Sequence, residues 1–188
     1  PLTEIRTALQ LVADRAALAI PEAAPWFGAK GVLTGIPVRR EFLENRRRSH
    51  IRGSMTLLIY GGSQGSHALN TVVCGALPGL KSLGPDLRLI HQTGVKELEA
   101  VRDAYRRAGV EGDVRAFLPR IYEEFGVADL IISRAGASTI AELAAAGKAA
   151  LLVPFPGASD NHQTKNAQAL QRAGAARMVP EGELAPSR

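Results

Sequence analysis

The sequence predicts an α/β fold in which helices cover both faces of one Rossmann-like parallel sheet. From about Met55 onward, short apolar runs alternate with amphipathic segments at regular spacing, as in repeated βαβ units. The 188 residues are 46% hydrophobic and 22% charged, which is ordinary for a globular chain with one sizeable core. We therefore expect one main domain over residues 55–188.

Six apolar runs are the expected strands, at residues 56–60, 87–92, 114–118, 130–133, 150–154 and 176–179. Helical periodicity and stop signals predict helices at residues 65–76, 95–108, 121–126, 139–146 and 162–173. Gly109, Gly147 and Gly174 follow three of these segments and are expected to close them as C-caps.

Residues 1–54 lack this regular alternation of short apolar runs and amphipathic segments. They suggest a helix at 3–17, a strand from residue 31 leading into a turn at Pro37, and a connecting segment beside the main domain. The net charge of +5 is concentrated in one run of arginines, at positions 39, 40, 46, 47, 48 and 52. This run is either a solvated surface or a contact for phosphate or anionic membrane. Because aromatic residues do not alternate with these arginines to stack bases, we expect no nucleic-acid partner.

Several classes are disfavoured by what the sequence lacks. Cys74 is the single cysteine and no run of 18 apolar residues occurs, which predicts a cytoplasmic protein without disulfides. No cluster has metal-ligand spacing, so a protein-held metal is not expected. The glycine-rich segment at residues 61–66 matches neither the Walker A pattern nor the pattern Gly-x-Gly-x-x-Gly. No Ser-His-Asp arrangement of a hydrolase is evident.

Two strand-to-helix turns could bind an anion. The loop 61–66, Gly-Gly-Ser-Gln-Gly-Ser, lets backbone amides approach a diphosphate, and Ser63 adds a hydroxyl; equally, Ser63 could be an N-cap. The segment 133–142 places small residues before a helix start, with Glu142 one turn inside to accept from sugar hydroxyls. Alternatively, Thr139 and Glu142 form a capping box.

A third polar turn spans residues 153–166. Gln163 and Asn166 lie three positions apart on the following helix, so both can face a polyhydroxylated ligand. The alternative is structural, with Asp160 or Asn161 as an N-cap and His162 as an ordinary first-turn residue.

Together with residues 34–39, these three loops resemble the C-terminal, donor-binding half of the MurG family. Its members are two-domain GT-B glycosyltransferases of peptidoglycan synthesis, which transfer N-acetylglucosamine (GlcNAc) from UDP-GlcNAc to lipid I with inversion and form lipid II. The resemblance covers nearly the whole chain and departs at Ile36, where the family usually has asparagine.

The resemblance also implies the residues that bind UDP-GlcNAc. Arg39, Ser63 and nearby amides contact the diphosphate, the Leu118 backbone contacts the uracil, Glu142 holds the ribose, and residues 162–166 read the sugar. The full set is Arg39, Gly62, Ser63, Gln64, Gly65, Leu118, Ala137, Ser138, Thr139, Glu142, His162, Gln163 and Asn166. No cofactor is implied; free Mg²⁺ beside the diphosphate stays open.

In that family the N-terminal domain supplies the catalytic base and the acceptor and membrane contacts. We therefore expect this chain to be a fragment, with residues 1–54 as the end of that domain plus the interdomain connection. The fragment is expected to bind UDP-sugar weakly without turnover, and the parent to be peripheral on the inner face of the cell membrane. Another GT-B UDP-sugar transferase, or a non-catalytic nucleotide-sugar binding module, stays as the alternative.

Overall fold

The computed structural model describes residues 12–19, 23–44, 53–158 and 161–186, and the chain divides into two compact units, Pro1–Val38 and Arg39–Arg188. The second unit contains the predicted sheet and every predicted binding residue. Its first helix, α3 (Arg40–Glu44), packs against the helices on one face of that sheet.

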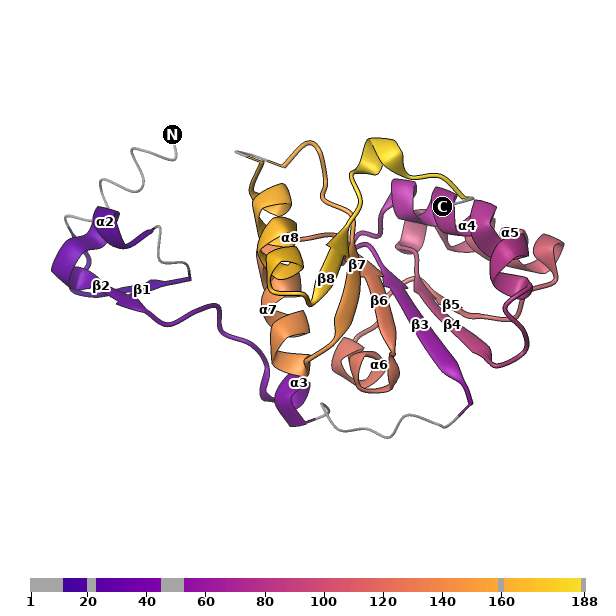
Figure 1. Ribbon diagram of the computed structural model, residues 1–188, viewed down its shortest axis with the longest axis horizontal. Helices are drawn as coiled ribbons and strands as arrows, with labels where there is room; N and C mark the ends of the chain where they lie inside the picture. Colours follow the sequence, from indigo (N-terminus) through magenta and orange to yellow (C-terminus); the bar gives the residue numbers. More distant parts are fainter. Residues whose placement is uncertain (1–11, 20–22, 45–52, 159–160, 187–188) are drawn as a thin grey trace. The chain divides into compact units, whose positions relative to one another are not determined.

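The sheet has six strands in the order β5-β4-β3-β6-β7-β8, and every neighbouring pair is parallel (Figure 1). The strands are β3 (Met55–Tyr60), β4 (Leu87–Gln92), β5 (Asp113–Arg115), β6 (Leu130–Ser133), β7 (Ala149–Leu152) and β8 (Ala176–Met178). The chain moves outward from β3 to β5 and then returns to continue at β6 on the other side of β3. This reversal between β3 and β6 is the place where open α/β sheets bind ligands.

Helices cover both faces of the sheet, which confirms the predicted fold class (Figure 1). One face carries α4 (His67–Lys81) and α5 (Leu98–Ala108), the latter preceded by the 3₁₀ turn η4 (Val95–Glu97). The other face carries α6 (Ile121–Val127), α7 (Ala137–Ala146) and α8 (His162–Arg172). Among the described residues, no helix combines the length and apolar character needed to cross a membrane.

The side chains of β3 alternate between the two layers. Leu57 and Ile59 join a buried cluster that includes residues of α4 and α5. Tyr60 points to the opposite layer, where its ring lies 5.7 Å from the ring of Phe125 in α6. Because successive side chains of a strand face opposite sides, the residue at the end of β3 is directed beneath α6 and α7.

Helix α4 differs from its predicted span of 65–76. It begins two residues later, at His67, and it continues past Pro78 to Lys81. Proline normally disrupts a helix interior. Here Leu69, Val73 and Leu77 recur at four-residue spacing and are almost fully buried, so packing of this apolar face extends the helix beyond the proline.

Two other predictions concern helix and strand ends. Gly109 and Gly147 adopt the left-handed conformation after α5 and α7, which confirms them as C-caps; Gly174, with φ +72°, follows Ala173 at the end of α8. Strand β5 ends at Arg115, earlier than the predicted residue 118. Beyond the strand, the Ala116 carbonyl accepts from the Gly94 amide in a loop contact, and residues 116–118 are not part of a strand.

The first unit contains a small parallel sheet of β1 (Ala16–Leu18) and β2 (Gly31–Leu33), joined through α2 (Ala24–Phe27) and η2 (Gly28–Lys30). The strand predicted at residue 31 is therefore confirmed. The predicted helix 3–17 is wrong at residues 13–17, which are not helical. At residues 16–17, pairing with β2 overrides the helical preference of alanine. Residues 3–11 of that predicted helix lie outside the described residues.

A polar network lies within the core between the sheet and α4–α5. His91 of β4 is fully buried, and its ring nitrogens lie 3.1 Å from Asn70 Oδ1 and 3.2 Å from Tyr105 Oη. Asn70 Nδ2 donates to the Thr93 carbonyl at 2.9 Å. Burial lowers the pKa of His91 from 6.5 to about 4, so the neutral ring is the form that suits the fold.

This lowered pKa predicts a loss of stability in mild acid. Between pH 6.5 and 4 the unfolded chain binds a proton at His91 that the folded chain does not, so stability falls as pH falls through this window and levels off below it. The expected loss is about 3 kcal/mol. Urea unfolding between pH 7 and 4 measures it, and His91→Gln should flatten the slope. An unchanged slope in that variant would assign the acid sensitivity to other groups.

Candidate functional site

The loop after β3 makes a tight turn at the carboxyl end of the strand. The Gly65 amide donates to the Gly62 carbonyl at 2.9 Å, and both glycines have positive φ, +88° at Gly62 and +76° at Gly65. The N-cap of α4 is Ser66, whose hydroxyl accepts from the Leu69 amide at 3.4 Å. The interpretation of Ser63 as the N-cap is therefore wrong, and the exposed Ser63 side chain lines a pocket instead.

Helix α7 begins without a side-chain cap. Its N-cap is Gly136 and its first residues are Ala137, Ser138 and Thr139, so Thr139 lies inside the first turn. No capping side chain bonds there, and the capping-box interpretation of Thr139 and Glu142 is wrong. The helix consequently presents its N-terminal amides and positive dipole end at the β6–α7 turn.

Glu142 is directed toward Arg39. The carboxylate oxygen Oε1 lies 4.0 Å from the guanidinium nitrogen Nη2, and the two side chains are 20% and 47% exposed. Burial raises the pKa of Glu142, while the positive charge of Arg39 opposes that rise. The guanidinium of Arg39 in turn lies 5.1 Å from the ring centre of Phe42 and 5.2 Å from that of Tyr122. These rings hold the cation beside the carboxylate.

These groups line one hollow of about 320 Å³, which we call the Glu142 pocket. It lies at the carboxyl ends of β3, β4 and β6 and combines charged, hydroxyl, apolar and glycine residues. Its lining residues are Arg39, Tyr60, Gly62, Ser63, Gln92, Phe117, Leu118, Pro119, Ile121, Ser138, Thr139 and Glu142. The structure thus gathers seven predicted residues: Arg39, Gly62, Ser63, Leu118, Ser138, Thr139 and Glu142.

Gln163 and Asn166 of α8 face the same side of the helix, as their spacing predicted. Gln163 Oε1 accepts from the Ala135 amide at 3.2 Å and from the Phe155 amide at 3.0 Å. Asn166 Nδ2 donates to the Ala135 carbonyl at 3.1 Å. The two amides therefore hold the β6–α7 turn against the loop that follows β7. Asn161 occupies the N-cap position of α8 with φ +55°, and its side chain accepts from Thr164 at 2.6 Å.

A second hollow, of about 590 Å³, lies beside the first, and we call it the Arg134 pocket. Gly62, Ser138 and Thr139 line both pockets, so the two adjoin, and we refer to them together as the cleft. The other lining residues of the second pocket are Gly61, Gly65, Ser66, His67, Ala68, Arg134, Gly136, Phe155, Gln163 and Glu181. Four predicted residues line neither pocket: Gln64, Ala137, His162 and Asn166. Residue Asp160 lies outside the described residues.

Sequence reasoning missed several cleft residues, including Arg134, Phe155 and Glu181. Arg134 is bound on three sides: Nη1 donates to the Val153 and Pro154 carbonyls at 3.3 Å each, and Nη2 pairs with Glu181 Oε2 at 2.5 Å. Its guanidinium also lies 5.4 Å from the Phe155 ring centre. Arg134 comes directly after β6, so its position at a strand end was the signal that could have identified it.

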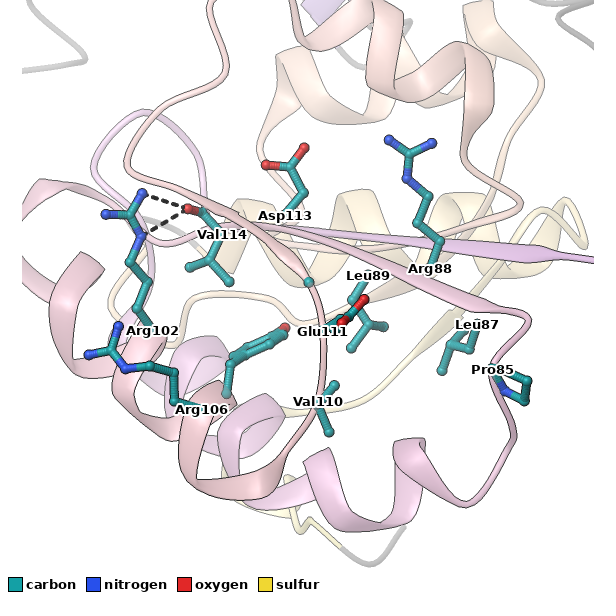
Figure 2. Close-up of a pocket in the computed structure, with 12 residues that line it drawn as sticks. Pro85, Leu87, Arg88, Leu89, Arg102, Arg106, Val110, Glu111, Asp113 and Val114 are labelled. Carbon is teal, nitrogen blue, oxygen red and sulfur yellow. Dashed lines mark hydrogen bonds between the residues drawn. The ribbon is translucent and has the colours of Figure 1, made fainter.

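A larger hollow lies elsewhere, at the amino ends of β4 and β5, with a volume of about 810 Å³ (Figure 2). None of the predicted binding residues lines it. Arg102 is used internally, since its guanidinium donates twice to the Val114 carbonyl, at 3.3 and 3.1 Å (Figure 2). Among the residues that the structure describes, no group of three histidine, cysteine or carboxylate side chains could hold a metal ion.

Comparisons with known proteins identify the family of this chain. Residues 56–188 match the model of the glycosyltransferase family 28 C-terminal domain. The chain is 46% identical over 173 residues to the UDP-N-acetylglucosamine–N-acetylmuramyl-(pentapeptide) pyrophosphoryl-undecaprenol N-acetylglucosamine transferase of Solibacter usitatus, covering 91% of this chain and 47% of that protein. The enzyme of the same name from Anaeromyxobacter sp. strain Fw109-5 is 47% identical over 173 residues, covering 91% and 45%.

Among solved structures, MurG of Acinetobacter baumannii is 34% identical with a TM-score of 0.75, over 97% of this chain and 51% of that one. The glycotransferase of kitacinnamycin, 19% identical with a TM-score of 0.63 over 94% and 45% of the two chains, shares the fold. The chain spans about half the length of the relatives it matches. The match over residues 56–188, together with the parallel sheet covered on both faces and the cleft at its edge, shows that the chain belongs to the family of the glycosyltransferase family 28 C-terminal domain.

Proposed function

We propose that this chain is the donor-binding part of a glycosyltransferase that transfers GlcNAc from UDP-GlcNAc to lipid I, forming lipid II in peptidoglycan synthesis. The observation that carries the proposal is the cleft itself, in which Arg39, Glu142 and the uncapped start of α7 meet at the strand carboxyl ends. The names of the 46–47% identical relatives give the same donor sugar and an undecaprenol-linked acceptor.

The diphosphate is assigned to the part of the cleft that both pockets share. Gly62, Ser138 and Thr139 line it, and the first amides of α7 supply donors and a positive dipole end. The Ser63 hydroxyl and the amide of Gln64 lie on the opposite loop, whose glycines allow close approach. Arg39 supplies the formal positive charge.

The nucleoside is assigned to the Glu142 pocket. An ionised carboxylate only accepts hydrogen bonds, so Glu142 can accept one hydrogen bond from each of the two ribose hydroxyls. Leu118 is buried at the same pocket, where its backbone groups can meet the hydrogen-bonding edge of uracil. Arg39 keeps the charged form of Glu142 favoured against the effect of burial.

The sugar is assigned to the Arg134 pocket. Gln163 lines this pocket, and its two bonds to the backbone use only Oε1, which leaves Nε2 to donate to a sugar hydroxyl. Asn166 supports Gln163 by fixing Ala135 from the same helix, and His162 stands at the start of that helix.

This arrangement stabilises the leaving group of an inverting transfer. As the acceptor hydroxyl attacks the anomeric carbon, negative charge grows on the departing diphosphate. Fixed hydrogen-bond donors aimed at such charge stabilise the transition state by several kcal/mol. The α7 amides and Arg39 are positioned for this task. We assign no catalytic base among the described residues, and place the base, the lipid acceptor and a peripheral contact with the inner face of the membrane in other parts of the parent enzyme.

Calorimetric titration of the 188-residue chain tests the donor assignment. We expect weak binding of UDP and UDP-GlcNAc, weaker binding of UDP-glucose, and the weakest binding of dTDP-sugars, whose deoxyribose lacks one hydroxyl for Glu142. The absence of heat with every UDP compound would refute the proposal. Equal affinity for dTDP-sugars and UDP-GlcNAc would instead indicate another sugar-nucleotide enzyme.

A further inference from the structure

Two buried hydroxyl groups lie side by side beneath the Glu142 pocket. Tyr60 and Ser133 are register partners at the ends of β3 and β6, so their side chains point to the same face of the sheet. The two residues are 4% and 0% exposed. Among the described residues neither hydroxyl oxygen has a hydrogen-bond partner. Since buried polar groups are nearly always paired, this pair requires an explanation.

The Tyr60 hydroxyl is close to the residues assigned to the ribose. Tyr60 lines the same pocket as Thr139 and Glu142, which lie three positions apart and therefore share one side of α7. Tyr60 is fixed from the other side by Phe125, with ring centres 5.7 Å apart and planes at 60°. The hydroxyl hydrogen can rotate, whereas the ring cannot leave without opening the core.

Its environment favours the protonated form of the Tyr60 hydroxyl. Burial raises the pKa of Tyr60, and the negative charge of Glu142 raises it further, against the opposing effect of the Thr139 and Ser133 hydroxyls. The Thr139 and Ser133 hydroxyls therefore lie close enough to influence the Tyr60 hydroxyl, although neither makes a well-formed hydrogen bond with it.

We propose that Tyr60 is a positioning residue for Glu142 and thereby makes the pocket selective for ribonucleotides over 2′-deoxyribonucleotides. When a nucleotide fills the pocket, the Tyr60 hydroxyl donates to Thr139 Oγ1, and the Thr139 hydroxyl donates to the Glu142 carboxylate. The carboxylate is then held in one orientation for the two ribose hydroxyls. The inference rests on the proposed function, because it needs a ribonucleotide at this pocket.

Tyr60→Phe separates this role from simple packing, since the ring remains and only the hydroxyl is lost. We expect the Kd for UDP to rise about fivefold to tenfold while the Kd for 2′-deoxy-UDP stays within about twofold, so that the discrimination ratio collapses. Thermal stability should not fall, because the variant removes an unpaired buried hydroxyl.

Tyr105→Phe is the matched control. Its hydroxyl is also buried but is bonded to His91, on the opposite face of the sheet. We expect this control to lose stability and to keep the wild-type ratio of UDP to 2′-deoxy-UDP affinity. The two tyrosine variants should therefore show opposite patterns of binding and stability.

A double-mutant cycle tests whether Tyr60 acts through Glu142. If it does, Tyr60→Phe combined with Glu142→Gln binds UDP no more weakly than Glu142→Gln alone. The inference is overturned if the increases in the Kd for UDP of the two single variants multiply in the double variant. It is also overturned if Tyr60→Phe keeps the wild-type ratio of UDP to 2′-deoxy-UDP affinity. A wild-type chain that binds no UDP would overturn the proposed function itself, so the two failures are distinguishable.

Discussion

Replacing Glu142 by alanine is expected to raise the Kd for UDP by more than about 100-fold. The carboxylate lies 4.0 Å from Arg39 and lines the pocket assigned to the nucleoside. Two hydrogen bonds to a charged acceptor would be lost with it, each of which contributes about 1.5–3 kcal/mol. The loss should vanish for 2′,3′-dideoxy-UDP, which offers no hydroxyls to the carboxylate.

The same variant should keep its thermal stability. Burial raises the pKa of Glu142, so the ionised side chain is disfavoured by folding and its removal relieves that cost. Glu44→Ala is the control, since Glu44 also lies on a helix next to an arginine, Arg40, but outside the cleft. Unchanged UDP affinity together with a lower melting temperature in Glu142→Ala would restore a structural role for this residue.

Replacing Gly65 by alanine is expected to lower the free energy of unfolding by several kcal/mol and to abolish UDP binding. Gly65 has φ +76°, and a Cβ atom there would lie 2.0 Å from the carbonyl oxygen of Thr93 and 2.8 Å from the Gly94 nitrogen. The obstacle is backbone, which cannot rotate away. The loop would have to separate from the end of β4, and the turn that carries Ser63 would move with it.

Two other glycines provide matched controls in urea unfolding. Gly62 also has positive φ, +88°, but a Cβ there meets nothing within 4 Å, so Gly62→Ala should cost only the backbone strain of about 1–2 kcal/mol. Gly79 lies inside α4 with open space around it, and Gly79→Ala should stabilise by about 1 kcal/mol. Equal stability of Gly65→Ala and Gly62→Ala would contradict the close contact with Thr93.

The parts of the fold that depend on local pattern could be predicted from the sequence. The strands at 87–92 and 130–133 coincide with β4 and β6, because short apolar runs bounded by turns report burial directly. Predictions failed where distant contacts decide the outcome. Residues 16–17 form a strand because β2 pairs with them, and α4 passes Pro78 because its apolar face is buried.

The candidate site shows the same division. The loops around Ser63 and Glu142 follow strands and contain recognisable glycines, so their approach to one another follows from the parallel topology. Tyr60 ends a strand and looks like an ordinary core residue in the sequence, and only the structure shows its unpaired hydroxyl beneath the pocket. Arg134 follows a strand and could have been identified by that position, but its pairing with Glu181, 47 positions later in the chain, could not.

The shared wall of the two pockets has a consequence for inhibitor chemistry. Small fragments that bind separately in the Glu142 and Arg134 pockets would meet at Gly62, Ser138 and Thr139. A linker spanning only these three residues would turn the second binding event into an intramolecular one, with an effective concentration in the millimolar range for a short flexible link. The cleft is therefore suited to fragment linking, and a compound built this way would need neither a charged diphosphate nor an intact sugar.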